Sequence, residues 1–203
     1  IAAGLAGGSS DAAATLRALN RLYGYPANED ELLCMSVRLG ADVPFCLCGG
    51  TALAEGIGEH LTVLPPAPPV TVLIACGGAG VSTPLAYRAL DEMYKGFSEP
   101  VLPDRQLQPL LSAIARGDAP GMSGTVFNLF EKAVLPHHSE ATESRNLMIS
   151  GGALCAMLSG SGPSVFGIFT EKAKADAVAG QIRENGWFAY VGGFAERKGI
   201  FEK

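Results

Sequence analysis

The chain has 203 residues, of which 48% are hydrophobic and 17% are charged, which excludes a disordered protein and allows one large domain or two small ones. The formal net charge of -5 and the lack of any Lys/Arg cluster argue against a nucleic-acid partner. The longest apolar run is far shorter than a membrane span of about 20 residues, and the first residues lack the pattern of a signal peptide, so no membrane partner is expected.

The first part of the chain is expected to form two helices, followed by three short antiparallel strands joined by tight glycine turns. The helices are predicted over residues 11–23 and 28–39, and the strands over residues 45–48, 51–55 and 61–64. Ser9, Ser10 and Asp11 are candidate N-caps of the first helix. Asn28 and Glu31 have the spacing of a capping box at the start of the second.

A proline-rich segment, Pro65–Pro69, stiffens the chain into an extended spacer, and we place a domain boundary there, between residues 1–66 and 67–203. After it, the predicted strands cover residues 70–76, 153–158, 165–169 and 187–192. One predicted helix begins near residue 83, and the others cover residues 106–116, 123–134, 138–149 and 171–185. This order predicts an α+β sandwich in which one helix layer covers an antiparallel sheet.

Glycine accounts for 26 of the 203 residues, well above the usual share of about 7%, and Gly4, Gly7 and Gly8 lie in the segment Gly4–Ala13 before the first helix. Unpaired N–H groups and the positive end of the helix dipole would face an anion there, and the missing Cβ atoms would let it approach the backbone. An ordinary helix cap after a loop is an equal alternative from these residues alone. Neither a P-loop nor a Rossmann glycine pattern is present, which disfavours both of those nucleotide sites.

Two further segments are candidates for chemistry. Asp42 follows the second helix between apolar neighbours, and a partly buried carboxylate there would be a base for a substrate hydroxyl. Its alternative role is to satisfy backbone donors in the turn. Ser159–Ser164 lies between two apolar strands and is either a second loop that approaches a ligand or a flexible connection. Two such loops in one chain favour a shared anionic ligand.

The histidines and cysteines give little sign of a metal or redox site. His60, His137 and His138 lack the spacing of metal ligands, so metal ligands stay unknown. Cys46 and Cys48 would face one way on the predicted strand, as half-buried thiols rather than a redox pair. The five cysteines sit mostly in apolar settings, which favours a reducing cytoplasm.

The three candidate segments, taken in this order, resemble the motifs of the GHMP family of small-molecule kinases. Gly4–Ala13 is similar to the family's ATP loop in its long form, Gly40–Glu59 to its catalytic-aspartate segment, and Met157–Pro163 to its third motif. Ser82–Pro84 matches the family's Ser-Thr-Pro segment. The similarity covers nearly the whole chain and is most specific in the second segment. The long loop and the run Ala54–Glu59 favour the kinases of a cytidine diphosphate-linked methylerythritol.

The resemblance implies the GHMP kinase architecture, with an incomplete ATP-binding domain of the ribosomal S5 domain 2 type and a ferredoxin-like C-terminal domain. Substrate and nucleotide would meet in the cleft between these domains. The implied reaction is the ATP- and Mg²⁺-dependent phosphorylation of the substrate's 2-hydroxyl in the non-mevalonate route to isoprenoid precursors. A cytoplasmic monomer or homodimer that binds only ATP and this small molecule is expected.

The resemblance also implies roles for individual residues. Asp42 would contact the substrate and take the proton from its 2-hydroxyl as that hydroxyl attacks the γ-phosphate. Tyr87 would stack on the cytosine ring, with Thr83 nearby. The residues expected to hold the ATP phosphates are Gly4, Leu5, Ala6, Gly7, Gly8, Ser9, Ser10, Gly160, Ser161 and Gly162.

Relatives in this family carry a catalytic lysine and contacts to cytidine in a segment before the ATP loop. We therefore expect the chain to correspond to the C-terminal part of such a kinase, to be inactive by itself, and to leave an unpaired sheet edge in its first domain. Two alternatives stay open. One is another GHMP kinase, acting on mevalonate or homoserine, and the other is a non-catalytic metabolite-binding module.

Overall fold

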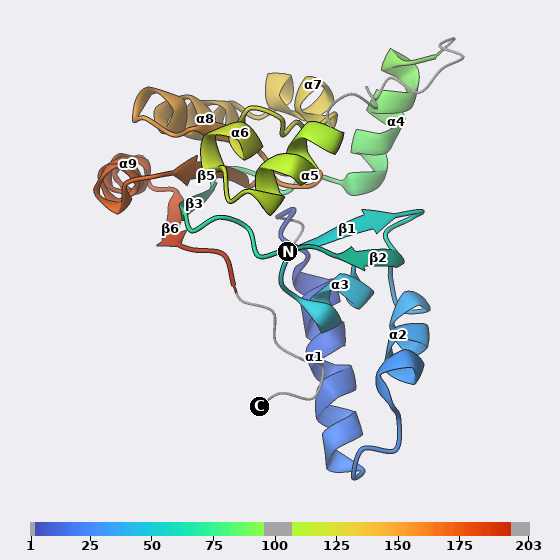
Figure 1. Cartoon of the computed structure of the whole chain (residues 1–203). Helices are drawn as coiled ribbons and strands as arrows, with labels where there is room; N and C mark the ends of the chain where they lie inside the picture. Colours follow the sequence, from blue (N-terminus) through green and yellow to red (C-terminus); the bar gives the residue numbers. More distant parts are fainter. Residues whose placement is uncertain (1–2, 96–106, 196–203) are drawn as a thin grey trace. The chain divides into compact units, whose positions relative to one another are not determined.

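The structure is a computed structural model that describes residues 3–95 and 107–195. These residues divide into two compact units (Figure 1). The larger unit contains the chain up to Leu5 together with Pro68–Phe194, and the smaller unit contains Ala6–Ala67 and Ala195. Within the described ranges, no helix combines the length and the apolar character that crossing a membrane requires.

The smaller unit, in its described residues, consists of three helices and a two-stranded hairpin. In chain order its elements are α1 (Gly7–Leu22), α2 (Glu29–Val37), α3 (Val43–Cys48), β1 (Ala52–Glu55) and β2 (His60–Val63). The predicted capping box of α2 is confirmed, because Asn28 and Glu31 each accept the other's backbone N–H with a side-chain oxygen. Buried residues of all three helices, among them Ala13, Leu32 and Leu47, form the core.

Helix α1 begins at Gly7, before the predicted start at residue 11. Ser9, Ser10 and Asp11 therefore lie inside the helix, and their prediction as N-caps is wrong. The N-cap is Ala6, whose left-handed backbone (φ 49°) turns the chain into the helix without any side-chain cap bond. The hydroxyl of Ser10 instead donates to the carbonyl of Gly7, 2.8 Å away.

The strand predicted over residues 45–48 is wrong, because these residues belong to helix α3. Pro44 lies in the first turn of α3, where its fixed φ suits a helix start. A short apolar run cannot be assigned to strand or helix from periodicity alone. Cys46 and Cys48 are therefore two positions apart on a helix and do not share a face, contrary to the sequence prediction.

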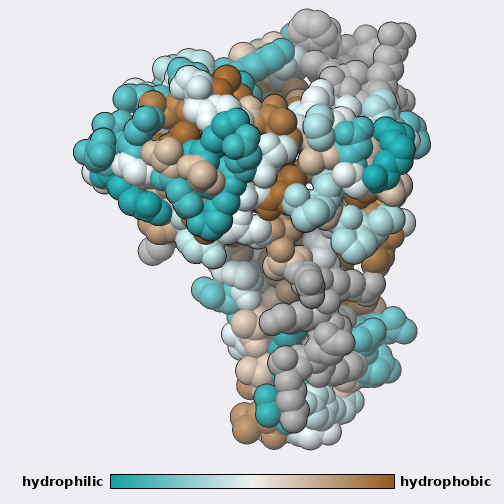
Figure 2. Space-filling model, turned by 60° about the vertical axis from the view of Figure 1, so that its left-hand side comes forward, coloured by the Kyte–Doolittle hydropathy of each residue, from teal (hydrophilic) through white to brown (hydrophobic). Residues whose placement is uncertain are grey.

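The hairpin of the smaller unit has the predicted antiparallel pairing, with Ala52 opposite Val63 and Glu55 opposite His60. Within the part of the chain that the structure describes, it forms a sheet of two strands, so each strand has one edge without a hydrogen-bonded neighbour. The expected open edge is therefore present. Val63 on this hairpin is exposed, and Figure 2 shows other hydrophobic residues reaching the surface among hydrophilic ones.

The larger unit is built on a four-stranded antiparallel sheet in the order β4-β5-β3-β6. Its strands are β3 (Thr71–Cys76), β4 (Cys155–Leu158), β5 (Val165–Phe169) and β6 (Phe188–Gly192). The chain forms a hairpin from β4 and β5, places β5 beside β3, and returns through a helix to β6 on the other side of β3. This is the split βαβ arrangement of ferredoxin-like folds. The predicted α+β class and ferredoxin-like topology are confirmed.

The described helices of the larger unit are α4 (Thr83–Met93), α5 (Leu107–Ala115), α6 (Ala119–Ser123), α7 (Phe130–Val134), α8 (Ser139–Ser150) and α9 (Lys172–Glu184), with a 3-10 turn at Leu135–His137. Leu73 and Ala75 share one face of β3 and belong to the same buried cluster as Met148 of α8 and Ile182 of α9. Helices α8 and α9 therefore cover that face of the sheet (Figure 1).

The single helix predicted over residues 123–134 is wrong, because two short helices, α6 and α7, occupy this region. Between them, the side chain of Asn128 accepts the backbone N–H of Phe130, 2.9 Å away, and starts a new turn. The helix predicted near 106–116 is present as α5, although residue 106 lies outside the described residues.

Candidate functional site

The larger unit presents a glycine turn directly after β4. The N–H of Ser159 donates to the carbonyl of Ser164 at 2.8 Å, and the N–H of Gly162 donates to the carbonyl of Ser159 at 2.9 Å. Gly160 (φ 54°) and Gly162 (φ 78°) both have left-handed backbone, which side chains with a Cβ rarely adopt. The shape of this segment, which we call the Ser159–Gly162 loop, therefore depends on glycine at both positions.

The first residues of the glycine-rich stretch lie against the Ser159–Gly162 loop. The hydroxyl of Ser159 donates to the carbonyl of Gly4 at 2.8 Å, and the N–H of Ser164 donates to the carbonyl of Ala3 at 3.2 Å. A Cβ on Gly4 (φ 74°) would lie 2.9 Å from the nitrogen of Gly162 and closer still to the carbonyl oxygen of Ser159. The two segments touch through their backbones, which is possible only without a side chain at residue 4.

Helix α4 brings the two predicted substrate residues next to the same loop. Thr83, at the start of α4, has its hydroxyl 2.7 Å from the hydroxyl of Ser161. Tyr87 lies one turn further along the same face. Tyr87 is 56% exposed, and its ring contacts Phe130 edge to face, with 4.9 Å between the ring centroids. This contact limits the tilt of the Tyr87 ring and leaves most of its surface available to a planar ligand.

The N-terminus of α1 in the smaller unit has the features of an anion site. The first intrahelical bond joins the N–H of Ser10 to the carbonyl of Ala6, so the N–H groups of Gly7, Gly8 and Ser9 are those that a helix start leaves unpaired. The first turn contains no acidic residue to neutralise the helix dipole. A Cβ added to Gly7 or Gly8 would meet nothing within 4 Å, so the backbone is open to an approaching group.

Asp42 occupies the N-cap position of α3, but its carboxylate makes no capping hydrogen bond. The side chain is exposed, so the expectation of a partly buried carboxylate is wrong, and so is the alternative that it satisfies backbone donors of the turn. The hairpin turn after β1 closes on this segment, because a Cβ on Gly58 (φ 118°) would lie 3.1 Å from the carbonyl oxygen of Ala41. The two halves of the predicted catalytic segment are therefore neighbours in space.

The turn itself is held by Glu59. Its own backbone N–H is the main cause that lowers the pKa of the Glu59 carboxyl, and the N–H of Ile57, 2.7 Å from the carboxylate, lowers it further. The carboxylate is therefore engaged with the turn backbone, which makes Glu59 a structural residue of the hairpin.

Arg17 of α1 holds the helix that carries Asp42. Its guanidinium donates to the carbonyl of Leu47 near the end of α3. The pKa of the Cys46 thiol, in the same helix, is raised mainly by burial and also by the carboxylate of Asp42, whereas Arg17 acts in the opposite direction. Asp42 and Arg17 thus act on Cys46 in opposite directions.

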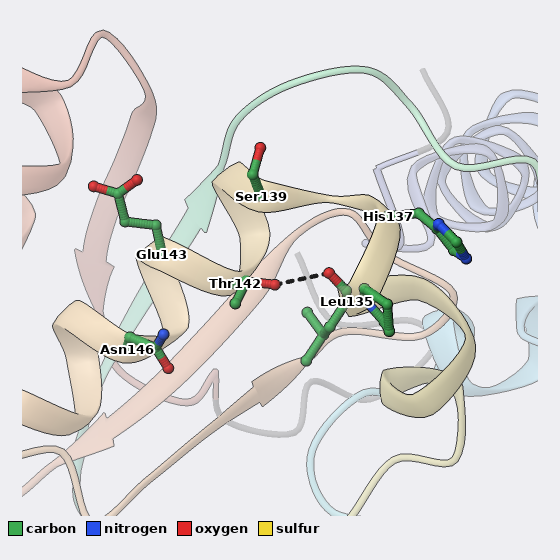
Figure 3. A pocket seen from close by; sticks show the side chains of 7 residues that line it. Leu135, His137, Ser139, Thr142, Glu143 and Asn146 are labelled. Carbon is green, nitrogen blue, oxygen red and sulfur yellow. Dashed lines mark hydrogen bonds between the residues drawn. The ribbon is translucent and has the colours of Figure 1, made fainter.

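A separate hollow of about 550 Å³ lies at the start of α8 (Figure 3). Its lining residues are Leu135, Pro136, His137, Ser139, Thr142, Glu143 and Asn146. The Thr142 hydroxyl donates to the carbonyl of Leu135 at 2.8 Å and is thereby used within the helix start. None of the predicted site residues lines this hollow. The described part of the chain also contains no group of three or more His, Cys, Asp or Glu side chains that could hold a metal ion.

Sequence reasoning missed two residues that hydrogen-bond with the backbone of the Ser159–Gly162 loop or of Leu158 just before it. The side-chain amide of Asn128 donates to the carbonyls of Leu158 and Gly160, at 2.9 and 2.8 Å. A carboxylate oxygen of Glu131 accepts the N–H of Leu158 at 3.0 Å. Both residues lie inside the helix that was predicted over residues 123–134, where they had no separate role. Their Asn-x-x-Glu spacing is the one that marks the cap of α2, and it was the available signal.

Comparisons with known proteins match most of the chain to kinases of one family. Residues 1–50 match the model of the GHMP kinases N terminal domain, and residues 110–186 match that of the GHMP kinases C terminal region. The 4-diphosphocytidyl-2-C-methyl-D-erythritol kinase of Lachnoclostridium phytofermentans is 44% identical over 178 residues, which are 87% of this chain and 58% of that protein. The kinase of the same name from Symbiobacterium thermophilum is 40% identical over 183 residues, which are 90% of this chain and 63% of that protein. The chain thus spans 58 to 63% of the length of these relatives.

Solved structures show the same likeness. A crystal structure of 4-(cytidine 5'-diphospho)-2C-methyl-D-erythritol kinase is 36% identical, with a TM-score of 0.74 over 96% of this chain and 67% of that one. The homoserine kinase of Cytophaga hutchinsonii has a TM-score of 0.78 over 98% of this chain and 68% of that one, at 20% identity. The second likeness concerns the fold alone.

Proposed function

This chain belongs to the GHMP kinase family, as the resemblance of its three motifs indicated, and from this premise we propose its activity. The proposed reaction is the ATP-dependent phosphorylation of the 2-hydroxyl of 4-diphosphocytidyl-2-C-methyl-D-erythritol, which yields the 2-phosphate and ADP in isoprenoid precursor biosynthesis. The observation that carries the proposal is the identity of 44% and 36% to kinases named for this substrate, over 87% and 96% of the chain.

The ATP phosphates bind to backbone N–H groups in this proposal. The residues assigned to them are Gly4, Leu5, Ala6, Gly7, Gly8, Ser9, Ser10, Gly160, Ser161 and Gly162. The unpaired N–H groups, open glycine positions and acid-free first turn of α1 support the first group. Mg²⁺ would neutralise charge on the transferred phosphoryl group. No side-chain ligand is assigned to the ion, since it commonly binds through phosphate oxygens and water.

Asp42 is the proposed general base. Its exposed carboxylate has no capping bond to break, so it is free to accept the proton of the substrate's 2-hydroxyl. The hydroxyl oxygen then attacks the γ-phosphorus as the bond to the ADP oxygen breaks. Arg17 donates to the carbonyl of Leu47 near the end of α3, and the Gly58 turn packs against the backbone of Ala41 just before Asp42. These neighbours, rather than hydrogen bonds of its own, support the position of the Asp42 carboxylate.

Thr83 and Tyr87 are the proposed contacts to the cytidine end of the substrate. A nucleobase can stack on the exposed ring of Tyr87, whose orientation Phe130 restrains. Such stacking would distinguish a cytidine-bearing substrate from mevalonate or homoserine, which carry no aromatic ring.

We further propose that residues 1–66 are part of the N-terminal ATP-binding domain and residues 67–203 form the C-terminal domain, in a cytoplasmic protein that is a monomer or a homodimer. The matched ranges 1–50 and 110–186 fall inside these two segments, which supports the division.

The test compares the cytidine substrate, mevalonate and homoserine as phosphate acceptors by ADP release, in a protein with the full length of these relatives. Turnover is expected with the cytidine substrate alone, and Asp42→Asn is expected to lower kcat by about 10² to 10⁴. Calorimetry on the 203-residue chain measures ATP binding, which Gly8→Asp should abolish. Equal kcat/KM for the three acceptors would contradict the substrate assignment, and undiminished ATP affinity in Gly8→Asp would contradict the phosphate site.

A further inference from the structure

Two side chains outside the assigned motifs hold the backbone at the entrance to the Ser159–Gly162 loop. Asn128 donates both amide hydrogens, one to the carbonyl of Leu158 at the end of β4 at 2.9 Å and one to the carbonyl of Gly160 in the loop at 2.8 Å. Glu131 accepts the N–H of Leu158 at 3.0 Å. Three hydrogen bonds thus fix the backbone of residues 158–160. Their side-chain partners lie three positions apart, one just before α7 and one inside it. We call Asn128 and Glu131 the Asn128–Glu131 clamp.

The clamp is itself anchored at both ends. The Oδ1 of Asn128 accepts the N–H of Phe130 at 2.9 Å, so the amide cannot rotate without losing this bond and both loop bonds. The carboxylate of Glu131 pairs with Arg145 of α8, with 3.2 Å between Oε1 and Nε, and both side chains are partly buried. The pair is therefore less screened than one at the surface. Asn128 is tied to α7, and Glu131 is tied to a helix of the main core.

The bond to the carbonyl of Gly160 decides which way the next peptide group points. In a trans peptide the C=O and the following N–H point in opposite directions. Because the amide of Asn128 holds the Gly160 carbonyl, the N–H of Ser161 points away from the clamp. Glycine at 160 offers little resistance to rotation of this peptide, since it populates several backbone regions almost equally. Without Asn128, the carbonyl oxygen could turn to the side where the N–H now points.

We propose that the Asn128–Glu131 clamp is a positioning device that keeps the Gly160–Ser161 peptide in the orientation that presents the N–H of Ser161, rather than the carbonyl of Gly160, to the ATP phosphates. This inference rests on the proposed function, in which the Ser159–Gly162 loop binds phosphate. The clamp touches neither nucleotide nor substrate. Its contribution is to remove the conformational freedom that two left-handed glycines would otherwise give the loop before binding.

The test replaces Asn128 by aspartate, which keeps an oxygen acceptor for Phe130 but cannot donate to the two carbonyls. Asn146→Asp is the matched control, because it makes the same charge change on an exposed residue of α8 in the same unit. Hydrogen exchange of residues 159–164, measured without nucleotide, is expected to rise about tenfold or more in Asn128→Asp, the size of effect expected when the two hydrogen bonds of the amide are lost together. Exchange in β5 and in the Asn146→Asp control should stay at the wild-type level.

A second readout separates positioning from general damage. In the turnover assay, Asn128→Asp should raise the KM for ATP about tenfold and leave the KM for the cytidine substrate unchanged, whereas loss of overall structure would raise both. If Asn128→Asp does not fold, Glu131→Gln is tested in its place. This variant keeps an acceptor for the N–H of Leu158 and removes the charge that pairs with Arg145. It should give a smaller rise in hydrogen exchange and in the KM for ATP than Asn128→Asp.

Unchanged exchange of residues 159–164 relative to the control would overturn the clamp, whatever the enzyme's activity. Faster exchange with an unchanged KM for ATP would overturn its role in phosphate binding. If the unmutated protein binds no ATP, the proposed function fails instead, and the exchange measurement still decides whether the clamp orders the loop.

Discussion

Replacing Gly4 by alanine is expected to destabilise the larger unit by about 2–3 kcal/mol, because two separate costs add. Residue 4 has φ 74°, where a residue with a Cβ loses about 1–2 kcal/mol relative to glycine. The new Cβ would also lie 2.9 Å from the nitrogen of Gly162 and nearer to the carbonyl of Ser159. Both neighbours are backbone atoms and cannot rotate away. Moving them would break the bond from Ser159 to the Gly4 carbonyl, which contributes about 1 kcal/mol.

Gly117→Ala is the matched control for this prediction. Gly117 lies in the same unit and has a similar left-handed backbone (φ 65°), but nothing lies within 4 Å of an added Cβ. Its replacement should therefore cost only the backbone term of about 1–2 kcal/mol. The free energy of unfolding is measured in denaturant by the fluorescence of Trp187, which is the only tryptophan of the chain and packs against the core of the larger unit. If Gly4→Ala destabilises no more than Gly117→Ala, the close backbone contact is not present.

Further predictions concern the candidate site. Tyr87→Ala should raise the KM for the cytidine substrate by about 5- to 150-fold, equivalent to a loss of about 1–3 kcal/mol of stacking, whereas Tyr87→Phe should leave this KM near the wild-type value; steady-state kinetics measure both. Because burial and Asp42 raise the pKa of Cys46, its thiolate forms at a higher pH than that of a free thiol. Alkylation of Cys46 should therefore be slower than that of the exposed Cys34 at neutral pH and should reach a similar rate only in alkaline buffer. Mass spectrometry of the labelled peptides measures both rates. Asp42→Asn removes a charge that raises this pKa, and should therefore speed the alkylation of Cys46 at a given pH. Gly8→Ala should stabilise the smaller unit by up to about 1 kcal/mol and at the same time weaken ATP binding, which denaturation and calorimetry report separately.

Local sequence signals predicted the elements that depend on local physics. The capping box of Asn28 and Glu31 sets the start of α2 through bonds three residues apart, and the apolar run Val165–Phe169 forms β5 with the predicted bounds. Helix α3 was missed because six residues with a proline fit a strand end and a helix start equally well. Its length is below what periodicity resolves, so the packing of Leu47 into the core decides its conformation.

The contacts of the candidate site were less predictable because they join distant residues through the backbone. Ser159 binds the carbonyl of Gly4 across 155 positions, and Asn128 binds Gly160 across 32. A carbonyl exists at every residue, so nothing in the sequence marks which one a side chain will contact. The motifs indicated which loops matter, whereas the residues that hold those loops became visible only in the fold.

The glycines of the candidate site fall into two classes, and the difference bears on function. Gly4, Gly160 and Gly162 have left-handed backbone or contacts that exclude a Cβ, so the fold itself requires them. Gly7 and Gly8 have neither: they lie in the first turn of α1, where an added Cβ meets nothing within 4 Å and alanine would be the better helix former. The smaller unit therefore gains no stability from glycine at these two positions. In the proposed function, the ATP phosphates approach this helix N-terminus closely, and the missing Cβ atoms at Gly7 and Gly8 leave room for them.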